Sequence, residues 1–370
     1  MKDATEPNEE TATARVAVDL RRGRGALSNA SGRFERTARE SFDDGWGSLE
    51  GLAAFKTEVA IEQAKSIIST NDSPDISFDQ SINPYRGCEH GCSYCYARPT
   101  HAYLGHSPGL DFETRLYAKV NAAEVLEREL ARPGYLCKTI ALGAVTDVYQ
   151  PIERERRITR SVLEVLSRTN HPVGIVTKSA LVLRDIDILA PMAAKGLAKV
   201  AISLTTLDRD VARRMEPRAA TPGRRVDTIR SLAAAGIPVT VMMAPIVPAI
   251  NDSEIEAILA EARGAGATDA GYVLLRLPLE LKELFREWLS EAFPDRAARV
   301  ISVLRSMHGG RDYVSAFGTR QRGTGPFAEQ IGTRFRLASR RLGLDERSLK
   351  LRTDLFERPL SERHGQLRLL

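Results

Sequence analysis

The chain has 370 residues, of which 43% are hydrophobic and 27% are charged, and its formal net charge is +5. This balance is typical of a folded globular protein and excludes collagen-like, mucin-like, coiled-coil and fully disordered chains. No apolar run reaches the ~18 residues of a membrane span, and the acidic start MKDATEPNEETATARVAVDL lacks the apolar core of a secretory signal. We therefore expect a cytoplasmic protein with reduced thiols and no membrane partner.

Composition divides the chain into four segments. Residues 1–45 are polar, with few large apolar positions, and are expected to form a disordered N-terminal arm. Residues 46–77 form a lead-in segment to the strand and helix patterns of residues 78–295. Residues 296–370 form an Arg-rich extension that is expected to be mainly helical. This extension carries 16 Lys/Arg against 7 Asp/Glu, a net charge of +9, whereas the rest of the chain has a net charge of −4. The asymmetry indicates either a polyanionic partner or a solvated arginine face.

Short apolar runs followed by helical patterns repeat six times between residues 78 and 292. Strands are predicted at 78–83, 138–144, 172–178, 198–204, 238–244 and 271–277. Helices are predicted at 121–131, 156–169, 181–194, 223–235, 252–264 and 280–292. Because each crossover must return to start the next strand, the strands form a parallel sheet. Polar residues follow all six strands, and a single rim of six strand ends favours a partial parallel (β/α)6 TIM-like barrel over an open sheet.

Three of the four cysteines fall in one loop after the first of these strands. The segment reads NPYRGCEHGCSYCYARP and contains Cys88, Cys92 and Cys95 at C-x₃-C-x₂-C spacing. Three thiolates are one short of both a closed zinc site and a fully capped four-iron cluster, so a cluster held here keeps one iron open. The alternatives are structural zinc completed by Cys137 or His90, and buried or incidental thiols. No second cysteine pair accompanies the loop, which favours the iron–sulfur interpretation.

The cysteine spacing, followed by an aromatic residue, resembles that of the radical S-adenosylmethionine (SAM) superfamily, and the likeness spans residues 78–292. The resemblance implies a [4Fe–4S] cluster on the three cysteines, whose open iron chelates the amino and carboxylate groups of S-adenosylmethionine. It also implies a one-electron reductant of the flavodoxin or ferredoxin type. Reductive cleavage would give methionine and a 5′-deoxyadenosyl radical, which abstracts hydrogen from a substrate, while the protein positions the reactants and excludes water and oxygen.

Within this superfamily the chain is similar to the DNA-repair-photolyase-like branch, which includes spore photoproduct lyase. The likeness rests on the blocks GCSYCYARP, GAVTDVYQPIE, VTKSALVLRDIDIL, AISLTTLDRDVARRMEP and MMAPIVPAINDSEI. At matching positions, the SAM contacts of the branch fall on Tyr96, Thr146, Lys178 and Ser203. A lysine suits the cofactor carboxylate, hydroxyls suit ribose or carboxylate, and a tyrosine ring packs on adenine. Their structural alternatives are a surface lysine, ordinary strand-end hydroxyls and a core tyrosine.

One position departs from the pattern of the branch. Spore photoproduct lyase has a cysteine two residues before its second-strand serine, and here Ala144 occupies that place. The nearest spare thiol, Cys137, precedes the strand and should therefore lie near its opposite end, as a structural residue. The resemblance does not extend to reversal of a pyrimidine dimer through that cysteine.

The C-terminal extension adds arginines but no recognised nucleic-acid motif. Arg320 and Arg322 flank glycines in GTRQRGTGPF, and the stretch 328–342 has helical spacing with Arg334, Arg340 and Arg341 off its apolar face. These five arginines are candidate nucleic-acid contacts, and the alternative is a helix that covers the barrel. His308 is interpreted as a loop residue rather than a base. The predicted function is a radical SAM enzyme acting on an unidentified substrate, with nucleic acid favoured; the rival is a zinc-stabilised nucleic-acid-binding protein without catalysis.

Overall fold

A computed structural model describes residues 15–16, 21, 23–35, 56–345 and 349–360 of the chain. Its centre is a seven-stranded sheet with the order β10-β9-β8-β7-β6-β3-β2. The strands are β2 (Ile68–Thr70), β3 (Gln80–Ile82), β6 (Ile140–Leu142), β7 (Val173–Thr177), β8 (Ala198–Ser203), β9 (Val239–Ile246) and β10 (Asp269–Leu274). Every pair from β3 to β10 is parallel, and only β2 runs antiparallel to its neighbour β3. The predicted mixed α/β fold with a parallel sheet is confirmed.

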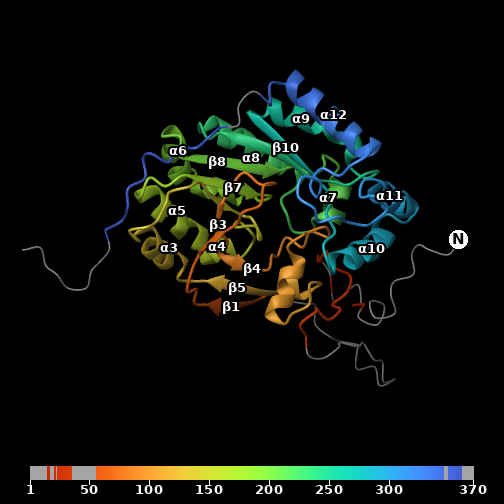
Figure 1. Cartoon of the computed structure of the whole chain (residues 1–370), viewed down its shortest axis with the longest axis horizontal. Helices are drawn as coiled ribbons and strands as arrows, with labels where there is room; N and C mark the ends of the chain where they lie inside the picture. The colour runs from red at the N-terminus through yellow and green to blue at the C-terminus, as the bar shows by residue number, and fades with distance from the viewer. Residues whose placement is uncertain (1–14, 17–20, 22, 36–55, 346–348, 361–370) are drawn as a thin grey trace, which may run out of the picture.

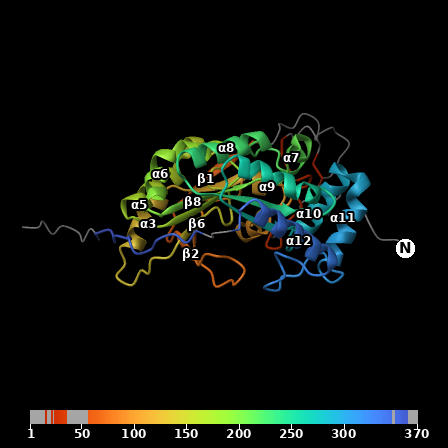
Figure 2. The same ribbon diagram turned by 90° about the horizontal axis from the view of Figure 1, so that it is seen from above.

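Helices α3 to α9 occupy the connections between these parallel strands, as the periodicity predicts, and α10 to α12 follow β10. The helices are α3 (Ala122–Leu130), α4 (Glu153–Arg156), α5 (Ile158–Arg168), α6 (Ile186–Ala194), α7 (Arg209–Met215), α8 (Pro222–Ala234), α9 (Ile255–Gly264), α10 (Leu281–Ala292), α11 (Pro294–Ser306) and α12 (Pro326–Arg341). Three short 3₁₀ helices accompany them: η1 (Arg98–Leu104), η2 (Ala180–Asp185) and η3 (Asp252–Glu254). Figures 1 and 2 show α5, α6, α8 and α9 arranged along the outside of the strands.

The strands bury alternate residues, because successive side chains point to opposite faces of a sheet. In β9, Val239, Val241 and Met243 are buried, whereas Thr240 and Met242 between them keep some exposure. β7 repeats the pattern with Val173 and Ile175 buried. The buried face packs under the helices and forms the main core, and the other face stays partly open.

A second, three-stranded sheet anchors the entrance to the cysteine loop. It has the order β1-β5-β4, with β1 (Glu58–Glu62) parallel to β5 (Arg115–Lys119) and β4 (Tyr85–Arg86) antiparallel to β5. A one-turn helix, α2 (Asp111–Thr114), leads directly into β5. Neither β1 nor β5 is predicted from the sequence, because both lie outside the repeating strand–helix pattern. Since β4 ends two residues before Cys88, the small sheet fixes where that loop begins.

A C-terminal loop links the two ends of the large sheet. The Leu274 N–H at the end of β10 donates to Gln321 O at 2.9 Å. Three residues earlier, the Gly318 N–H donates to Asp75 Oδ1 at 2.7 Å, and Arg320 Nε lies 2.5 Å from Asp75 Oδ2. Asp75 belongs to the connection between β2 and β3, at the other end of the sheet, and Figure 2 shows the two loops on the same side of the molecule. Residues 318–321 therefore span the open side of the sheet.

The structure corrects the N-terminal expectation and refines the C-terminal one. Residues 23–35 were expected within a disordered arm, yet residues 24–28 are buried because they pack on the cysteine loop. Residues 1–14, 17–20, 22 and 36–45 of that arm lie outside the described residues, as do 46–55, 346–348 and 361–370. The expected boundary at 295/296 falls inside α11. In the part of the chain that the structure describes, no helix is long and apolar enough to cross a membrane.

Candidate active site

The cysteine loop is held from both sides by backbone hydrogen bonds. The Cys88 N–H donates to Phe112 O at 2.9 Å, and the Ser93 N–H donates to Met215 O at 3.0 Å. Gly87 and Gly91 have positive φ angles of 75° and 66°, which glycine adopts without strain. The loop thus turns sharply twice between β4 and η1, at the carboxyl end of the parallel sheet.

The three thiols of this loop lie near one another, with Cys88 and Cys92 buried and Cys95 partly exposed. Burial raises the pKa of Cys88, and nearby Asp147, Cys92 and Cys95 raise it further. Burial likewise raises the pKa of Cys92 to about 12, although Lys178 opposes the shift. A thiolate at these positions therefore needs a positive centre beside it, which is what metal coordination supplies.

Asp147 joins the loop after β6 to both the cysteine loop and the end of β7. It accepts hydrogen bonds from Thr177 Oγ1 at 2.7 Å and from the Lys178 N–H at 2.8 Å. His90 Nδ1 lies 3.3 Å from Oδ2, the oxygen that also accepts from Lys178. Burial opposes ionisation of Asp147, but His90 and these donors hold its pKa below the ordinary value. The geometry favours a role for Asp147 in orienting these neighbours. Thr146, one residue earlier, is buried, and its hydroxyl donates to Tyr85 O at 3.4 Å.

Lys178 extends from the end of β7 over the cysteine loop. Its Nζ lies 5.8 Å from the centre of the Tyr94 ring, which sits between Cys92 and Cys95 in sequence. The Lys178 ammonium interacts electrostatically with Cys92 and Glu216. Among the described contacts its side chain has no carboxylate partner within ion-pair distance, so its charge is available to a ligand.

A buried ion pair supports the same loop from the side of β8. Arg225 and Glu216 form this pair, and the Tyr94 hydroxyl also donates to Glu216. Arg225 Nη1 donates to Ser203 O at 3.0 Å, which fixes the end of β8 where Ser203 lies buried. Burial opposes ionisation of Glu216, while Arg225 and Lys178 hold its pKa below the ordinary value. The pair therefore connects Ser203 with the loop that carries the thiols.

Tyr96 lies between the segment that follows β6 and the segment that follows β10. Its hydroxyl donates to Ala144 O, just beyond β6, and the Arg276 guanidinium stacks 4.2 Å from its ring centre. The Tyr96 side chain is 45% exposed, which disagrees with its interpretation as a core residue. The ring is therefore open to a bound molecule.

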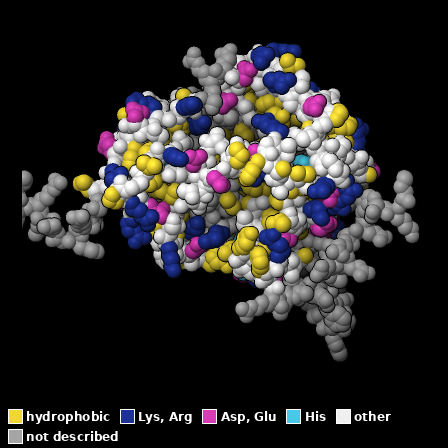
Figure 3. Space-filling view, viewed as in Figure 1, with side chains coloured by type: hydrophobic (Ala, Val, Ile, Leu, Met, Phe, Trp, Pro, Cys, Tyr) yellow, Lys and Arg dark blue, Asp and Glu magenta, His cyan; other side chains and the backbone are white. Residues whose placement is uncertain are grey.

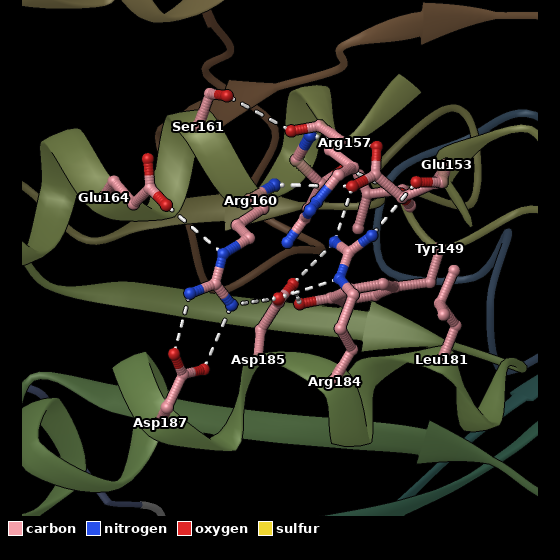
Figure 4. A network of polar contacts seen from close by, with 12 residues as sticks. Tyr149, Glu153, Arg157, Arg160, Ser161, Glu164, Leu181, Arg184, Asp185 and Asp187 are labelled. Atoms are coloured by element: carbon pink, nitrogen blue, oxygen red, sulfur yellow. Dashed lines mark hydrogen bonds and ion pairs between the residues drawn. The ribbon is translucent and has the colours of Figure 1, made fainter. Parts of the chain in front are cut away.

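A network of ion pairs stabilises the loops that follow β6 and β7 (Figure 4). Glu153 accepts hydrogen bonds from the Tyr85 hydroxyl and, at 2.7 Å, from Arg184 Nη2. Asp185 accepts from the Tyr149 hydroxyl at 3.0 Å and from Arg160 Nη1 at 2.9 Å. Glu153 and Asp185 are both fully buried. The network ties the strand before the cysteines to the loops after β6 and β7, which carry Thr146 and Lys178.

The residues proposed as fourth zinc ligands lie elsewhere. Cys137 precedes β6, and its neighbour Leu136 accepts a hydrogen bond at 3.4 Å from Gln80 at the start of β3. It therefore lies at the opposite end of the sheet from the thiol loop, as expected. His90 instead faces Asp147. Across the described residues, no three His, Cys, Asp or Glu side chains are arranged around a single metal ion. In a cluster, by contrast, each thiolate binds a different iron.

Four of the five arginines predicted to contact nucleic acid have partners within the chain. Arg320 pairs with Asp75, and Arg334 forms two hydrogen bonds with Glu256 on α9. Arg322 stacks 3.9 Å above the Tyr272 ring. α12 buries its apolar residues against the core, while Arg340 and Arg341 are exposed. Arg340 Nε lies 3.7 Å from Asp345 Oδ2 in an exposed ion pair. Figure 3 shows Lys and Arg side chains spread over one face of the molecule, with acidic ones among them.

Two contacts of the site were missed from the sequence, whereas His308 lies in the turn after α11, as expected of a loop residue. His308 is buried there, and burial lowers its pKa. The Glu216–Arg225 pair and the partner of Arg276 were not anticipated. The pair joins the end of α7 to α8, and its contact with Tyr94, like that of Arg276 with Tyr96, joins segments far apart in the chain. The one available signal was that Arg276 lies near the carboxyl end of a predicted strand, where ligand-binding residues gather; Glu216, at the end of α7, gave no such signal.

Comparison with known proteins identifies a matching family, similar sequences and similar structures. A family model described as the Radical SAM superfamily matches residues 82–262. An uncharacterized protein of Mycobacterium tuberculosis is 37% identical over 232 residues, covering 62% of this chain and 68% of that protein. An uncharacterized protein of Methanocaldococcus jannaschii is 25% identical over 240 residues, covering 65% and 85%. The structure of spore photoproduct lyase complexed with dinucleoside spore photoproduct is similar in fold, with a TM-score of 0.55 and 16% identity over 77% of this chain and 79% of that one.

Proposed function

The chain belongs to the radical SAM superfamily of enzymes, and we propose that it holds a [4Fe–4S] cluster on Cys88, Cys92 and Cys95. The donor set fits this cluster, because three neighbouring thiols come from one loop and the fourth cysteine lies at the other end of the sheet. With S-adenosylmethionine bound, the cluster would supply one-electron cleavage to a 5′-deoxyadenosyl radical. Because the chain belongs to a superfamily of enzymes, we do not propose the alternative function of a zinc-stabilised nucleic-acid-binding protein without catalysis. The observation that carries the proposal is the placement of the three thiols in one loop, with the Lys178 ammonium over it.

Four side chains around the thiols are proposed to bind S-adenosylmethionine. Lys178 provides an ammonium without a carboxylate partner within the described contacts, suited to the cofactor carboxylate. Thr146 and Ser203 stand at the ends of β6 and β8 and offer hydroxyls. Tyr96 presents a partly exposed ring suited to adenine. The positions of these residues, at four segments that surround one loop, support their assignment to one ligand.

The sheet itself is proposed to be a partial (β/α)6 barrel. Six parallel strands follow in chain order, and residues 318–321 connect β10 with the connection before β3. A partial barrel of this kind would exclude water from the carboxyl ends of the strands, where the radical must be protected. The radical chemistry calls for a one-electron reductant of the flavodoxin or ferredoxin type and favours a reducing compartment such as the cytoplasm.

Nucleic acid is the substrate class that we favour. One similar structure is described as spore photoproduct lyase with a dinucleoside photoproduct, and the segment 296–370 of this chain has a net charge of +9. Arg340 and Arg341 are the predicted contacts whose side chains remain exposed on α12. Reversal of a thymine dimer through a cysteine is not proposed, because Ala144 occupies the matching position.

The cofactor proposal is tested by anaerobic reconstitution. The wild-type chain is expected to bind about four iron and four sulfide. Cys92→Ala should lose this cluster, whereas the matched variant Cys137→Ala should retain it. Stoichiometric zinc without sulfide in the wild type, or an equal loss from both variants, would contradict the proposal.

The substrate proposal is tested separately by isotope transfer. The reduced enzyme is incubated with S-adenosylmethionine and with DNA or RNA deuterated at the candidate positions. We expect deuterium in 5′-deoxyadenosine, and less of it from the Arg340→Ala/Arg341→Ala double variant. Formation of 5′-deoxyadenosine without deuterium from any nucleic acid would overturn the substrate class while leaving the cofactor chemistry intact.

A further inference from the structure

Residues 23–35, here termed the N-terminal strap, cross the outside of the cysteine loop. Gly25 and Ala26 donate their backbone N–H groups to the two carboxylate oxygens of Glu113, at 2.9 and 2.8 Å. Glu113 is fully buried in α2, and Arg24 Nη1 donates to its backbone carbonyl at 3.0 Å. The strap is thus fastened by charge-assisted hydrogen bonds to a fixed carboxylate.

The same carboxylate also holds the cysteine loop. Arg98, only 1% exposed, lies 2.5 Å from Glu113 Oε1 through Nη2 and donates from Nε to Cys92 O at 3.0 Å. Its Nη1 donates to Gly109 O at 2.9 Å. Every donor of this buried guanidinium therefore fixes a backbone carbonyl or Glu113. One ion pair connects the strap to the backbone of a cluster ligand.

The strap approaches its neighbours so closely that only glycine fits. A Cβ atom on Gly25 would lie 1.6 Å from Gly91 O, inside the cysteine loop. A Cβ atom on Gly109 would lie 2.3 Å from Ser28 O in the strap. Both obstacles are backbone atoms, which cannot move aside as the end of a flexible side chain can. A side chain at either position would therefore force the strap away from the backbone against which it packs.

The other side of the strap is held by α10, which follows the last strand of the sheet. Ser28 Oγ donates to the buried Glu287 at 2.7 Å, and Arg33 Nε lies 2.7 Å from Glu280 Oε1. Just before the strap, Arg21 pairs with Glu291 at 2.9 Å. The strap thus connects the first and the last strand–helix units, on the side of the molecule where the thiols lie.

We propose that the strap positions the cysteine loop and keeps solvent away from its thiols, with Gly25, Arg98 and Glu113 as the positioning residues. The inference rests on the proposed assignment of Cys88, Cys92 and Cys95 as cluster ligands. In this proposal, opening of the strap exposes Cys88 and Cys92 while the sheet stays folded. The strap would then set both the rate of cluster loss and the reactivity of the metal-free thiols.

The test measures alkylation of each cysteine in the metal-free chain by iodoacetamide, followed by peptide mass spectrometry. Gly25→Ala should raise the rates at Cys88 and Cys92 by about tenfold relative to Cys137, because local opening governs access to buried groups. The matched control is Gly134→Ala, where a Cβ atom meets nothing within 4 Å. A chain without residues 1–35 should show the same selective increase. Both altered chains should also lose reconstituted iron faster than the control.

The outcomes separate this inference from the cofactor proposal. Unchanged Cys88 and Cys92 rates, relative to Cys137, in both Gly25→Ala and the shortened chain would overturn the role of the strap. Alkylation of all four cysteines at the rate of the denatured chain would also overturn it, since the strap would then stabilise the whole fold. Selective exposure of the thiols in a protein that binds no iron would uphold the strap and contradict the cluster.

Discussion

His90 Nδ1 lies 3.3 Å from Asp147 Oδ2, and this contact joins the cysteine loop to the loop that follows β6. The same carboxylate fixes the Lys178 backbone N–H at 2.8 Å. Asp147 therefore fixes the cysteine loop, the adjacent residue Thr146 and Lys178 relative to one another.

Asp147→Asn tests this role. An amide offers one acceptor oxygen instead of two, so a donor from β7 or His90 loses its partner, at a cost of about 1–3 kcal/mol. We expect the affinity for S-adenosylmethionine to fall by about tenfold or more, measured by calorimetry on the reconstituted enzyme, with its iron content unchanged. Asp187→Asn, an exposed partner of Arg160, serves as the control. Equal affinities in the two variants would contradict the role of Asp147.

Lys178→Met removes the ammonium that stands over the cysteine loop. Because the proposed contact is an ion pair with the cofactor carboxylate, the dissociation constant should rise by about tenfold or more, with the cluster retained. Lys195→Met changes a lysine that bonds to Asn170 at 2.8 Å, beyond α6 and away from the thiols. The assignment is wrong if both variants bind the cofactor as the wild type does.

Arg225→Met breaks the buried pair with Glu216. It leaves a carboxylate buried without its cation, which costs about 3–5 kcal/mol. On the same helix, Arg230 forms an exposed pair with Asp227, so Arg230→Met should cost less than about 1 kcal/mol. Urea unfolding of both chains checks the contrast. Similar free energies of unfolding would show that the Glu216–Arg225 pair does not support the fold.

His171 predicts how stability responds to acid. Burial lowers its pKa to about 4, and its Nε2 lies 2.7 Å from the Tyr135 hydroxyl. Between pH 6.5 and 4 the unfolded chain binds a proton that the folded chain refuses, so the free energy of unfolding falls as the pH falls. The loss amounts to at most about 3 kcal/mol. His171→Phe should lose that much less over the same interval, whereas parallel pH curves for the two chains would contradict the prediction.

The six parallel strands of the seven-stranded sheet and the position of the thiol loop follow from the sequence, because both depend on local patterns. Hydrophobic periodicity marks β7 and β8, and the cysteine spacing marks the loop that follows the first parallel strand. The end of each strand locates Thr146, Lys178 and Ser203, since the carboxyl ends of parallel strands share one edge.

The strap and the buried ion pairs do not follow from local patterns. Residues 24–28 lie in a stretch with few large apolar positions, whose composition is typical of disorder, and contacts with distant residues such as Glu113 and Glu287 order them. From the sequence alone, Arg320 and Arg334 are interpreted as unpaired surface charges. Their carboxylate partners, Asp75 and Glu256, lie far away in sequence. A net charge of a segment does not reveal which of its charges are already paired.

The most direct test of the central claim is the formation of 5′-deoxyadenosine by the reconstituted chain. Dithionite and S-adenosylmethionine are added under anaerobic conditions, and the product is quantified by liquid chromatography. We predict 5′-deoxyadenosine from the wild type and from Cys137→Ala, and none from Cys88→Ala, Cys92→Ala or Cys95→Ala. No product from a wild-type chain loaded with about four iron and four sulfide, or undiminished product from the three loop variants, would contradict the account.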